Sequence, residues 1–143
     1  MANYASYLKK LSGGDRSGNP FLEFMDMRLV ELKEGYASFS MPILPAFLQG
    51  AGQMQGGLIV AMADETIAHA IMTVLKEDEG ITTVELKNDF LAAVSKGLLT
   101  AEAKIFKKGR RLIIGDCIVK DDGKRPVART SATFLLLREN ASP

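Results

Sequence analysis

The sequence contains few of the residue types on which several classes of functional site depend. Its 143 residues include one cysteine, one histidine and no tryptophan. A single cysteine, Cys117, excludes an intramolecular disulfide, as is common in a reducing compartment. One histidine and one cysteine cannot form a Cys/His zinc cluster within one chain. We therefore predict that the protein binds no metal, and we interpret Cys117 as a packing residue in a strand.

The chain also lacks an excess of one charge and an uninterrupted hydrophobic segment. Lysine and arginine total 18 and aspartate and glutamate 17, so the formal net charge is +1. Such a balance creates no field that would attract nucleic acid or an anionic membrane. The most apolar run, residues 56–75, has Asp64, Glu65 and His69 near its centre, which argues against a membrane span. Because the N-terminus also lacks the apolar core of a signal peptide, we expect a cytoplasmic protein.

The length and the hydrophobic pattern predict a single α+β domain over residues 1–143. Short helical segments are expected at 4–11 and 21–24, and one long helix at 56–75. Strands are expected at residues 25–32, 36–41, 81–91, 98–106, 112–120 and 127–137. The short connections between the last four strands predict an antiparallel meander. Because the long helix is apolar on nearly every side, we expect one antiparallel sheet to wrap around it.

Two adjacent carboxylates in this helix have different surroundings. His69 lies one helical turn beyond Glu65 and is a local partner for an ion pair or hydrogen bond. The positions one turn from Asp64 are all apolar, so its carboxylate needs water, a ligand, another chain or a structural partner such as Arg28, Arg129 or a backbone amide. Burial without a partner would raise the pKa of Asp64, as expected of a general base or nucleophile.

The helix is expected to begin at the sequence Gln55-Gly56-Gly57. The first turn of a helix has backbone N–H groups without intrahelical acceptors, at the positive end of the helix dipole. These donors suit an anion or a developing oxyanion, and glycine allows a carbonyl group to approach the backbone closely. A tight entry into the helix would explain the same two glycines without any ligand.

The spacing of Gln55-Gly56-Gly57, six further residues and Asp64 resembles the motif of the hotdog-fold thioesterases, specifically the PaaI-like acyl-CoA thioesterases. Their usual motif is His-Gly-Gly, six residues, then Asp or Glu. The segment 82–86, Phe90-Leu91, Gly97, Gly109-Arg110 and the last strand also resemble that family, so the resemblance covers roughly residues 19–137. It implies the hotdog fold, in which an antiparallel sheet wraps around one long central helix.

The resemblance implies a role for each matching residue. Asp64 matches the catalytic carboxylate, Gly56 the backbone donor to the thioester carbonyl, and Gln49 and Thr83 the residues that orient substrate or water. Gln55 stands where relatives have histidine, which leaves substrate preference and rate open. The remaining substrate-binding candidates are Gln55, Gly57 and Glu65 beside the motif, Phe47, Met54 and Phe90 as acyl-pocket lining, and Lys108 and Arg110 as contacts to coenzyme A phosphates. The last two also fit a solvated hairpin tip.

The same resemblance implies hydrolysis of an acyl-CoA without a cofactor, since coenzyme A is part of the substrate. It also implies a homodimer, or a dimer of dimers, whose active sites lie between subunits. Gly56 and Asp64 are about 12 Å apart along a straight helix, too far to act on one carbonyl within a chain. Two alternatives stay open, a non-catalytic acyl-CoA-binding protein and, with less support, an acyl-CoA hydratase or dehydratase.

Overall fold

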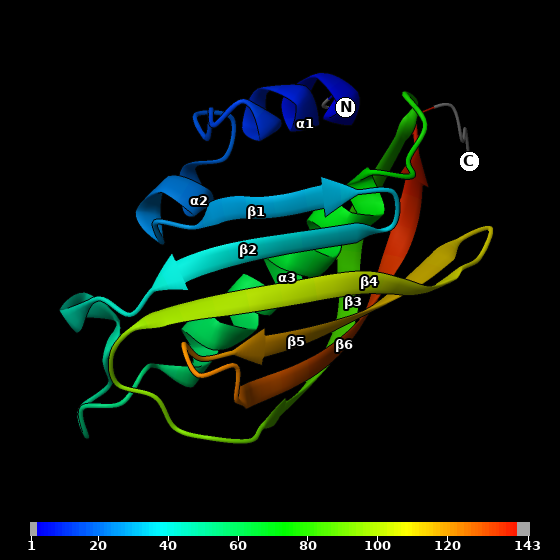
Figure 1. Ribbon diagram of the computed structural model, residues 1–143. Coiled ribbons are helices and arrows are strands. Elements are labelled where there is room, and N and C mark those ends of the chain that lie inside the picture. Colours follow the sequence, from blue (N-terminus) through cyan, green and yellow to red (C-terminus); the bar gives the residue numbers. More distant parts are fainter. Residues whose placement is uncertain (1–2, 140–143) are drawn as a thin grey trace.

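A computed structural model of the chain describes residues 3–139. One long helix, α3 (Gly56–Met72), lies against a six-stranded antiparallel sheet that curves around it (Figure 1). The strands are β1 (Arg28–Lys33), β2 (Tyr36–Pro42), β3 (Glu79–Phe90), β4 (Leu98–Lys108), β5 (Leu112–Lys120) and β6 (Pro126–Arg138). Two short helices, α1 (Tyr4–Ser12) and α2 (Pro20–Phe24), precede the sheet, and a single 3-10 turn, η1 (Pro45–Phe47), follows β2. The expected α+β architecture is confirmed.

The strand order, β1-β2-β4-β5-β6-β3, corrects the expected four-strand meander. Strands β4, β5 and β6 do follow one another, but β3 pairs with β6 at the far edge, and β2 occupies the place beside β4. Residues 91–97 span about 20 Å when extended, enough to cross the three strand spacings, about 14 Å, between β3 and β4. The short connection between β3 and β4 is therefore long enough to join two strands that are not neighbours in the sheet.

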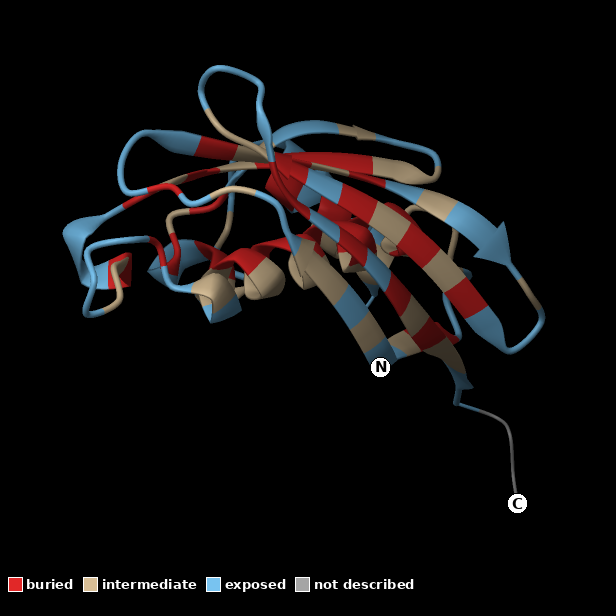
Figure 2. Ribbon diagram, turned by 90° about the horizontal axis from the view of Figure 1, so that it is seen from below, coloured by how far each residue is buried: buried red, intermediate tan, exposed pale blue. Residues whose placement is uncertain are grey.

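Helix α3 is shorter than expected because it ends at Met72 rather than at residue 75. The core lies between α3 and the sheet, and buried and exposed bands alternate along the strands (Figure 2). Strand β5 is typical, since Ile113, Cys117 and Val119 are buried on the helix side. No room exists for a side chain at Gly115, where a Cβ would lie 2.5 Å from Ile67 of α3. This close approach fixes how α3 crosses the sheet.

The N-terminal segment is attached to the same core. Asn3 caps α1 and Asn19 caps α2, each by accepting hydrogen bonds from backbone N–H groups of the first turn. Leu8, Leu11 and Leu22 are the buried residues of these two helices. Strand β1 begins at Arg28, later than the expected residue 25, because Asp26 adopts a φ of 50° in the preceding turn. No helix within residues 3–139 is long and apolar enough to span a membrane.

Candidate active site at the start and middle of helix α3

The entry to α3 is an exposed helix start. Gln55 is its N-cap residue, but the side chain makes no capping hydrogen bond, and the Gln55 backbone N–H donates to the carbonyl of Phe47 at 2.9 Å. The N–H groups of Leu58 and Ile59 donate to the carbonyl of Gln55. The backbone amides of Gly56 and Gly57 precede this first hydrogen-bonded turn, at the positive end of the helix dipole. The local geometry therefore suits an incoming carbonyl oxygen or oxyanion.

An apolar groove of about 400 Å³ opens beside this helix start. It is lined in part by Met54, Ile59, Phe90 and Val94. The Phe90 ring, 58% exposed, packs directly on Gly56, where an added Cβ would lie 2.9 Å from the ring. Of the three aromatic and methionine side chains expected in an acyl pocket, Met54 and Phe90 line this groove. Phe47 does not, because it is buried in the core and packs against Phe24 with ring centroids 6.3 Å apart.

Asp64 points toward β3, where the Thr83 hydroxyl donates a hydrogen bond to its Oδ1 at 3.0 Å. Neither arginine considered from the sequence reaches it, because Arg28 pairs with Asp26 and Arg129 with Asp89. Burial raises the pKa of the Asp64 carboxyl above its ordinary value, and the hydrogen bond from Thr83 opposes that rise. Two of the residues predicted to be catalytic are thus direct neighbours.

Glu65 has partners of its own, and its expected hydrogen bond with His69 is confirmed, although it is formed by the Glu65 backbone carbonyl and not by the carboxylate. The Glu65 carboxylate accepts a hydrogen bond from the Asn19 side-chain amide at 3.1 Å. The His69 ring instead donates through Nδ1 to the Glu65 backbone carbonyl at 2.6 Å, while Nδ1 is 3.7 Å from the Glu65 carboxylate. The Tyr7 hydroxyl donates to His69 Nε2 at 2.7 Å. Burial lowers the pKa of His69 to about 4, so the ring is neutral at pH 7 and forms no ion pair.

Sequence reasoning missed this contact because Tyr7 and Asn19 lie far from His69 and Glu65 along the chain. The capping pattern at Asn19-Pro20 predicted a helix start, which is confirmed, but it gave no sign that the Asn19 amide also reaches α3. A second polar residue that sequence reasoning overlooked is Asn88 on β3. Its side-chain oxygen accepts a hydrogen bond from Thr130 at 2.6 Å, while its buried Nδ2 has no partner within residues 3–139.

Gln49 belongs to the turn before α3. Its side-chain oxygen accepts a hydrogen bond from the Ala51 backbone N–H, and its own N–H donates to the Gln53 carbonyl at 2.7 Å. The side chain therefore stabilises the turn, and within residues 3–139 it forms no hydrogen bond with Asp64 or Thr83.

The two predicted phosphate contacts lie at the opposite end of α3 from Gly56. Lys108 Nζ donates to the carbonyl of Val74, just beyond the C-terminal end of the helix, at 3.0 Å. The Arg110 carbonyl accepts from Arg138 at the end of β6. An α-helix of 17 residues is about 25 Å long, so one chain does not bring these residues to its own Gly56.

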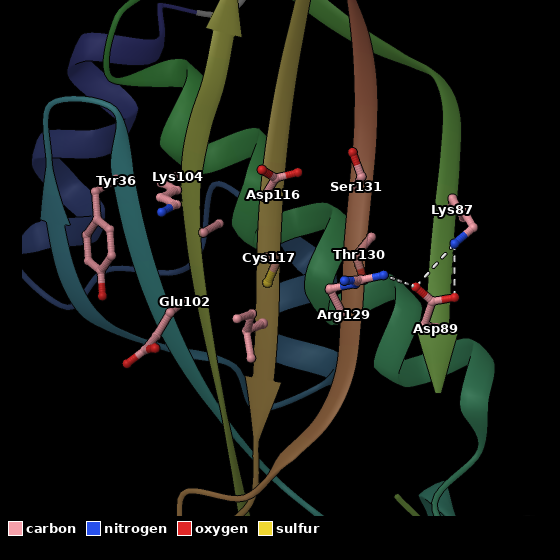
Figure 3. Close-up of a pocket in the computed structure, with 12 residues that line it drawn as sticks. Tyr36, Lys87, Asp89, Glu102, Lys104, Asp116, Cys117, Arg129, Thr130 and Ser131 are labelled. Atoms are coloured by element: carbon pink, nitrogen blue, oxygen red, sulfur yellow. Dashed lines mark hydrogen bonds and ion pairs between the residues drawn. The ribbon is translucent and has the colours of Figure 1, made fainter. Parts of the chain in front are cut away.

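A hollow of about 560 Å³ lies on the outer face of the sheet and is separate from this site. Figure 3 shows its polar lining, in which Asp89 of β3 contacts both Lys87 and Arg129. Cys117 also lines this hollow and is buried, and burial raises the pKa of its thiol to about 12. Such a thiol is not a nucleophile at neutral pH, which agrees with its interpretation as a packing residue.

Strand β3 forms one edge of the sheet, because its ladder partner within residues 3–139 is β6 alone. The segment around Thr83 is exposed, including Val84 at 51%, and a β-bulge interrupts the ladder between Thr83 and Glu85. The Asp64–Thr83 pair therefore lies beside an open strand edge. No group of three or more potential metal ligands occurs among residues 3–139.

Comparison with known proteins agrees with this arrangement. The family model described as the thioesterase superfamily matches residues 51–128, which include α3, strands β3, β4 and β5 and the start of β6. A curated relative from Saccharolobus solfataricus, named as a candidate esterase, is 28% identical over 123 residues, 86% of this chain and 87% of its own length.

Two solved structures illustrate the likeness of fold. A thioesterase family protein from Silicibacter pomeroyi superposes with a TM-score of 0.82 at 25% identity and covers 92% of this chain and 98% of its own. A variant of the phenylacetic acid degradation protein PaaI from Thermus thermophilus superposes with a TM-score of 0.76 at 21% identity, covering 82% of this chain and 98% of its own. With its antiparallel sheet curved around α3, the chain has the hotdog fold and belongs to the thioesterase superfamily.

Proposed function

We propose that the protein hydrolyses an acyl-CoA thioester to a free acid and coenzyme A, at a site shared between two copies of the chain. The observation that carries this proposal is the position of Asp64. Its carboxylate is half-buried in apolar surroundings, has a raised pKa and accepts a hydrogen bond from Thr83 beside the open edge of β3. A carboxylate held in this way is suited to act as a base or nucleophile.

The start of α3 supplies the complementary group. The thioester carbonyl would lie at Gly56, where the backbone amide and the helix dipole stabilise the negative charge that develops on its oxygen. The acyl group would occupy the apolar groove lined by Met54, Ile59 and Phe90. Asp64 would either attack the carbonyl carbon or deprotonate the water that attacks it. The carbon–sulfur bond then breaks, and coenzyme A leaves as the thiol after taking up a proton. If Asp64 is the nucleophile, water then hydrolyses the mixed anhydride formed on its carboxylate, which releases the free acid and restores Asp64.

The separation of the two groups favours a dimer. Gly56 and Asp64 are about 12 Å apart along α3, whereas both must reach one carbonyl. If the β3 edges of two copies pair in antiparallel orientation, the start of one α3 lies alongside the middle and end of the other. Such pairing would also cover the exposed edge residues around Val84. The active site would then combine Gly56 of one copy with Asp64 of the other.

Thiol release from a panel of acyl-CoAs tests the proposal directly. Asp64→Asn should lower kcat by about 10²–10⁴-fold, the range for loss of a general base. The control variant Asp116→Asn makes the same chemical change on the outer face of the sheet and should keep wild-type activity. If the wild type releases no thiol, or Asp64→Asn retains full activity, the proposal is wrong. Tight acyl-CoA binding without turnover would support a binding protein instead.

A mixing experiment tests the shared site. A Gly56→Val variant should also be inactive, because its side chain would collide with the Phe90 ring beside the helix start. Mixing it with Asp64→Asn gives heterodimers in which one site has both native residues, so activity should return. If each chain had a complete site of its own, no mixture would recover activity.

A hydratase or dehydratase receives no support from this site. That chemistry in hotdog proteins pairs a carboxylate with a catalytic histidine. The single histidine, His69, is fully buried and uses both ring nitrogens in hydrogen bonds within the core.

A further inference from the structure

The side chain of Asn88 on β3 has a buried hydrogen-bond donor that the chain leaves unused. Its oxygen accepts a hydrogen bond from the Thr130 hydroxyl of β6 at 2.6 Å. That separation is usual for an O–H···O bond and short for an N–H···O bond, so the amide has its oxygen toward Thr130 and its NH2 group directed away. The Nδ2 atom is buried, and no other buried side-chain nitrogen or oxygen within residues 3–139 lacks a partner. Because an unpaired buried donor costs free energy, this one calls for an explanation.

Asn88 is on the helix-facing side of β3. Its neighbours Lys87 and Asp89 line the hollow on the outer face of the sheet (Figure 3), and side chains alternate between the two faces along a strand. Leu86, two residues before it on the same face, packs against the core. Its ladder partner on β6, Thr130, is fully buried. The unused donor therefore lies on the inner side of the edge strand.

Two contacts between β3 and α3 place Asn88 beside the candidate site. The Phe90 ring packs on Gly56, and the Thr83 hydroxyl donates to Asp64, so the strand and the helix run side by side over this stretch. Asn88 is two residues from Phe90, about 7 Å along the strand, and five residues from Thr83. Its amide is therefore nearer to the helix start and the apolar groove than to the Asp64 of its own chain.

The chemistry of this donor selects one kind of acceptor. An amide NH2 group is uncharged and only donates, so its partner must supply a lone pair, as an oxygen atom does. The nearest side chains on the same face of β3, Leu86 and Phe90, are apolar, and a carboxylate would lose its hydration there without gaining a cation. A neutral hydroxyl or carbonyl oxygen is the better match. Because Nδ2 is already shielded from water, a hydrogen bond to such an oxygen is not offset by dehydration of the donor.

We propose that Asn88 determines acyl specificity by donating a hydrogen bond from Nδ2 to a neutral oxygen on the acyl group. The acyl group would reach the amide from the apolar groove, past the Phe90 ring, which is 58% exposed and has room to change rotamer. Thioesters of hydroxy or oxo acids would then be better substrates than thioesters of plain hydrocarbon acids. This inference deepens the proposed function and rests on it, because it assigns the acyl end of the same substrate.

The test compares thioesters that match in size and differ in one oxygen. 3-Hydroxybutanoyl-CoA is paired with 3-methylbutanoyl-CoA, and 3-hydroxybenzoyl-CoA with 3-methylbenzoyl-CoA. In at least one pair the wild type should prefer the hydroxylated member by about tenfold or more in kcat/KM, the effect of one hydrogen bond to a buried donor. Asn88→Leu keeps a similar shape but has no donor, so it should abolish this preference. The loss should fall on the hydroxylated member and leave the methylated one unchanged or better used.

Matched variants separate specificity from stability. Asn88→Leu leaves the Thr130 hydroxyl without its acceptor, so the double variant Asn88→Leu/Thr130→Val removes both partners, should keep the fold and should lose the same preference. Lys87→Leu makes a polar-to-apolar change on the outer face of the same strand and should keep the wild-type preference. The proposal is overturned if the wild type shows no preference in either pair, or if the preference survives in both Asn88 variants. It is also overturned if Asn88→Leu slows both members of each pair equally, which would assign Asn88 to the structure or to contact with a second copy.

A binding measurement keeps this inference distinct from the catalytic proposal. Calorimetric titration of the paired thioesters into Asp64→Asn should show the same preference in Kd, and adding Asn88→Leu to that variant should remove it. If the preference appears in binding while the wild type hydrolyses neither thioester, the catalytic proposal fails and the role of Asn88 stands. If thioesters are hydrolysed but neither kcat/KM nor Kd distinguishes the members of a pair, the catalytic proposal stands and the role of Asn88 fails.

Discussion

His69 makes the stability of this protein depend on pH in a way that can be worked out from its contacts. The ring is fully buried, donates from Nδ1 to the Glu65 carbonyl and accepts at Nε2 from the Tyr7 hydroxyl. Phe39 covers it with an edge contact at a centroid distance of 4.8 Å. Protonating Nε2 would remove the acceptor for Tyr7 and place a charge in the core. Burial accordingly lowers the pKa of His69 from 6.5 to about 4.

The sign and size of the effect follow from this difference. Between pH 6.5 and pH 4 the unfolded chain binds a proton on His69 and the folded chain does not, so the free energy of unfolding falls as the pH falls. At 1.36 kcal/mol for each pH unit, the loss from pH 7 to pH 4 is about 3 kcal/mol. For a chain of this length the corresponding decrease in Tm is about 10 °C. The raised pKa values of Asp64 and Glu65 act in the opposite direction, because their protonated forms favour the folded state.

The assay is therefore a comparison of pH profiles. Chemical denaturation between pH 4 and pH 7.5 would be followed for the wild type and for the double variant Tyr7→Phe/His69→Leu, which removes the ring and its hydroxyl partner together. The difference in unfolding free energy between the two proteins should change by about 3 kcal/mol across this range. Parallel profiles would refute the reasoning. A Tyr7→Phe single variant should lose about 1–3 kcal/mol at pH 7, because it leaves Nε2 buried without a donor.

Two further predictions concern the candidate site. Gly56→Ala should lower kcat/KM for acyl-CoA because its Cβ would lie 2.9 Å from the Phe90 ring, and the double variant Gly56→Ala/Phe90→Ala should recover part of the loss. At Gly57 an added Cβ would meet nothing within 4 Å, so Gly57→Ala should lower kcat/KM less than Gly56→Ala does. It should also raise the free energy of unfolding by up to about 1 kcal/mol. Equal losses of kcat/KM at both glycines would contradict this account. Thr83→Val removes the hydrogen bond that lowers the pKa of Asp64, so the acidic limb of the kcat/KM profile should move to higher pH. An unmoved limb would mean that Asp64 is not the group whose ionisation controls the rate.

Local patterns in the sequence were enough to predict most elements of the fold. The α3 start at Gly56 and both bounds of β5 lie where they were expected, because helix starts and hairpin turns depend on neighbouring residues. The strand order was not predictable in the same way. Which strand lies beside β4 depends on how α3 and residues 91–97 cross the sheet, and no local signal encodes that choice. The meander was therefore correct for β4, β5 and β6 and wrong for β3.

In the candidate site, too, some features could be predicted from local sequence and others required the tertiary structure. The helical period alone predicted that Asp64 and Glu65 have different neighbours. It indicated that the residues three and four positions from Asp64 on its own helix are all apolar. Their actual partners come from other elements, Thr83 from β3 and Asn19 from the start of α2. Contacts across such sequence separations form only when the chain packs, so they required the tertiary structure.

The sequence by itself determined the elements, the open glycine start of α3 and the isolation of Asp64, because each depends on residues within a few positions of one another. Only the tertiary structure decided that Asp64 faces Thr83 at an open strand edge and that His69 is locked to Tyr7. It also placed Lys108 at the far end of α3 from Gly56. The physical reason is that the curvature of the sheet around the helix, which no local pattern specifies, sets which distant side chains meet.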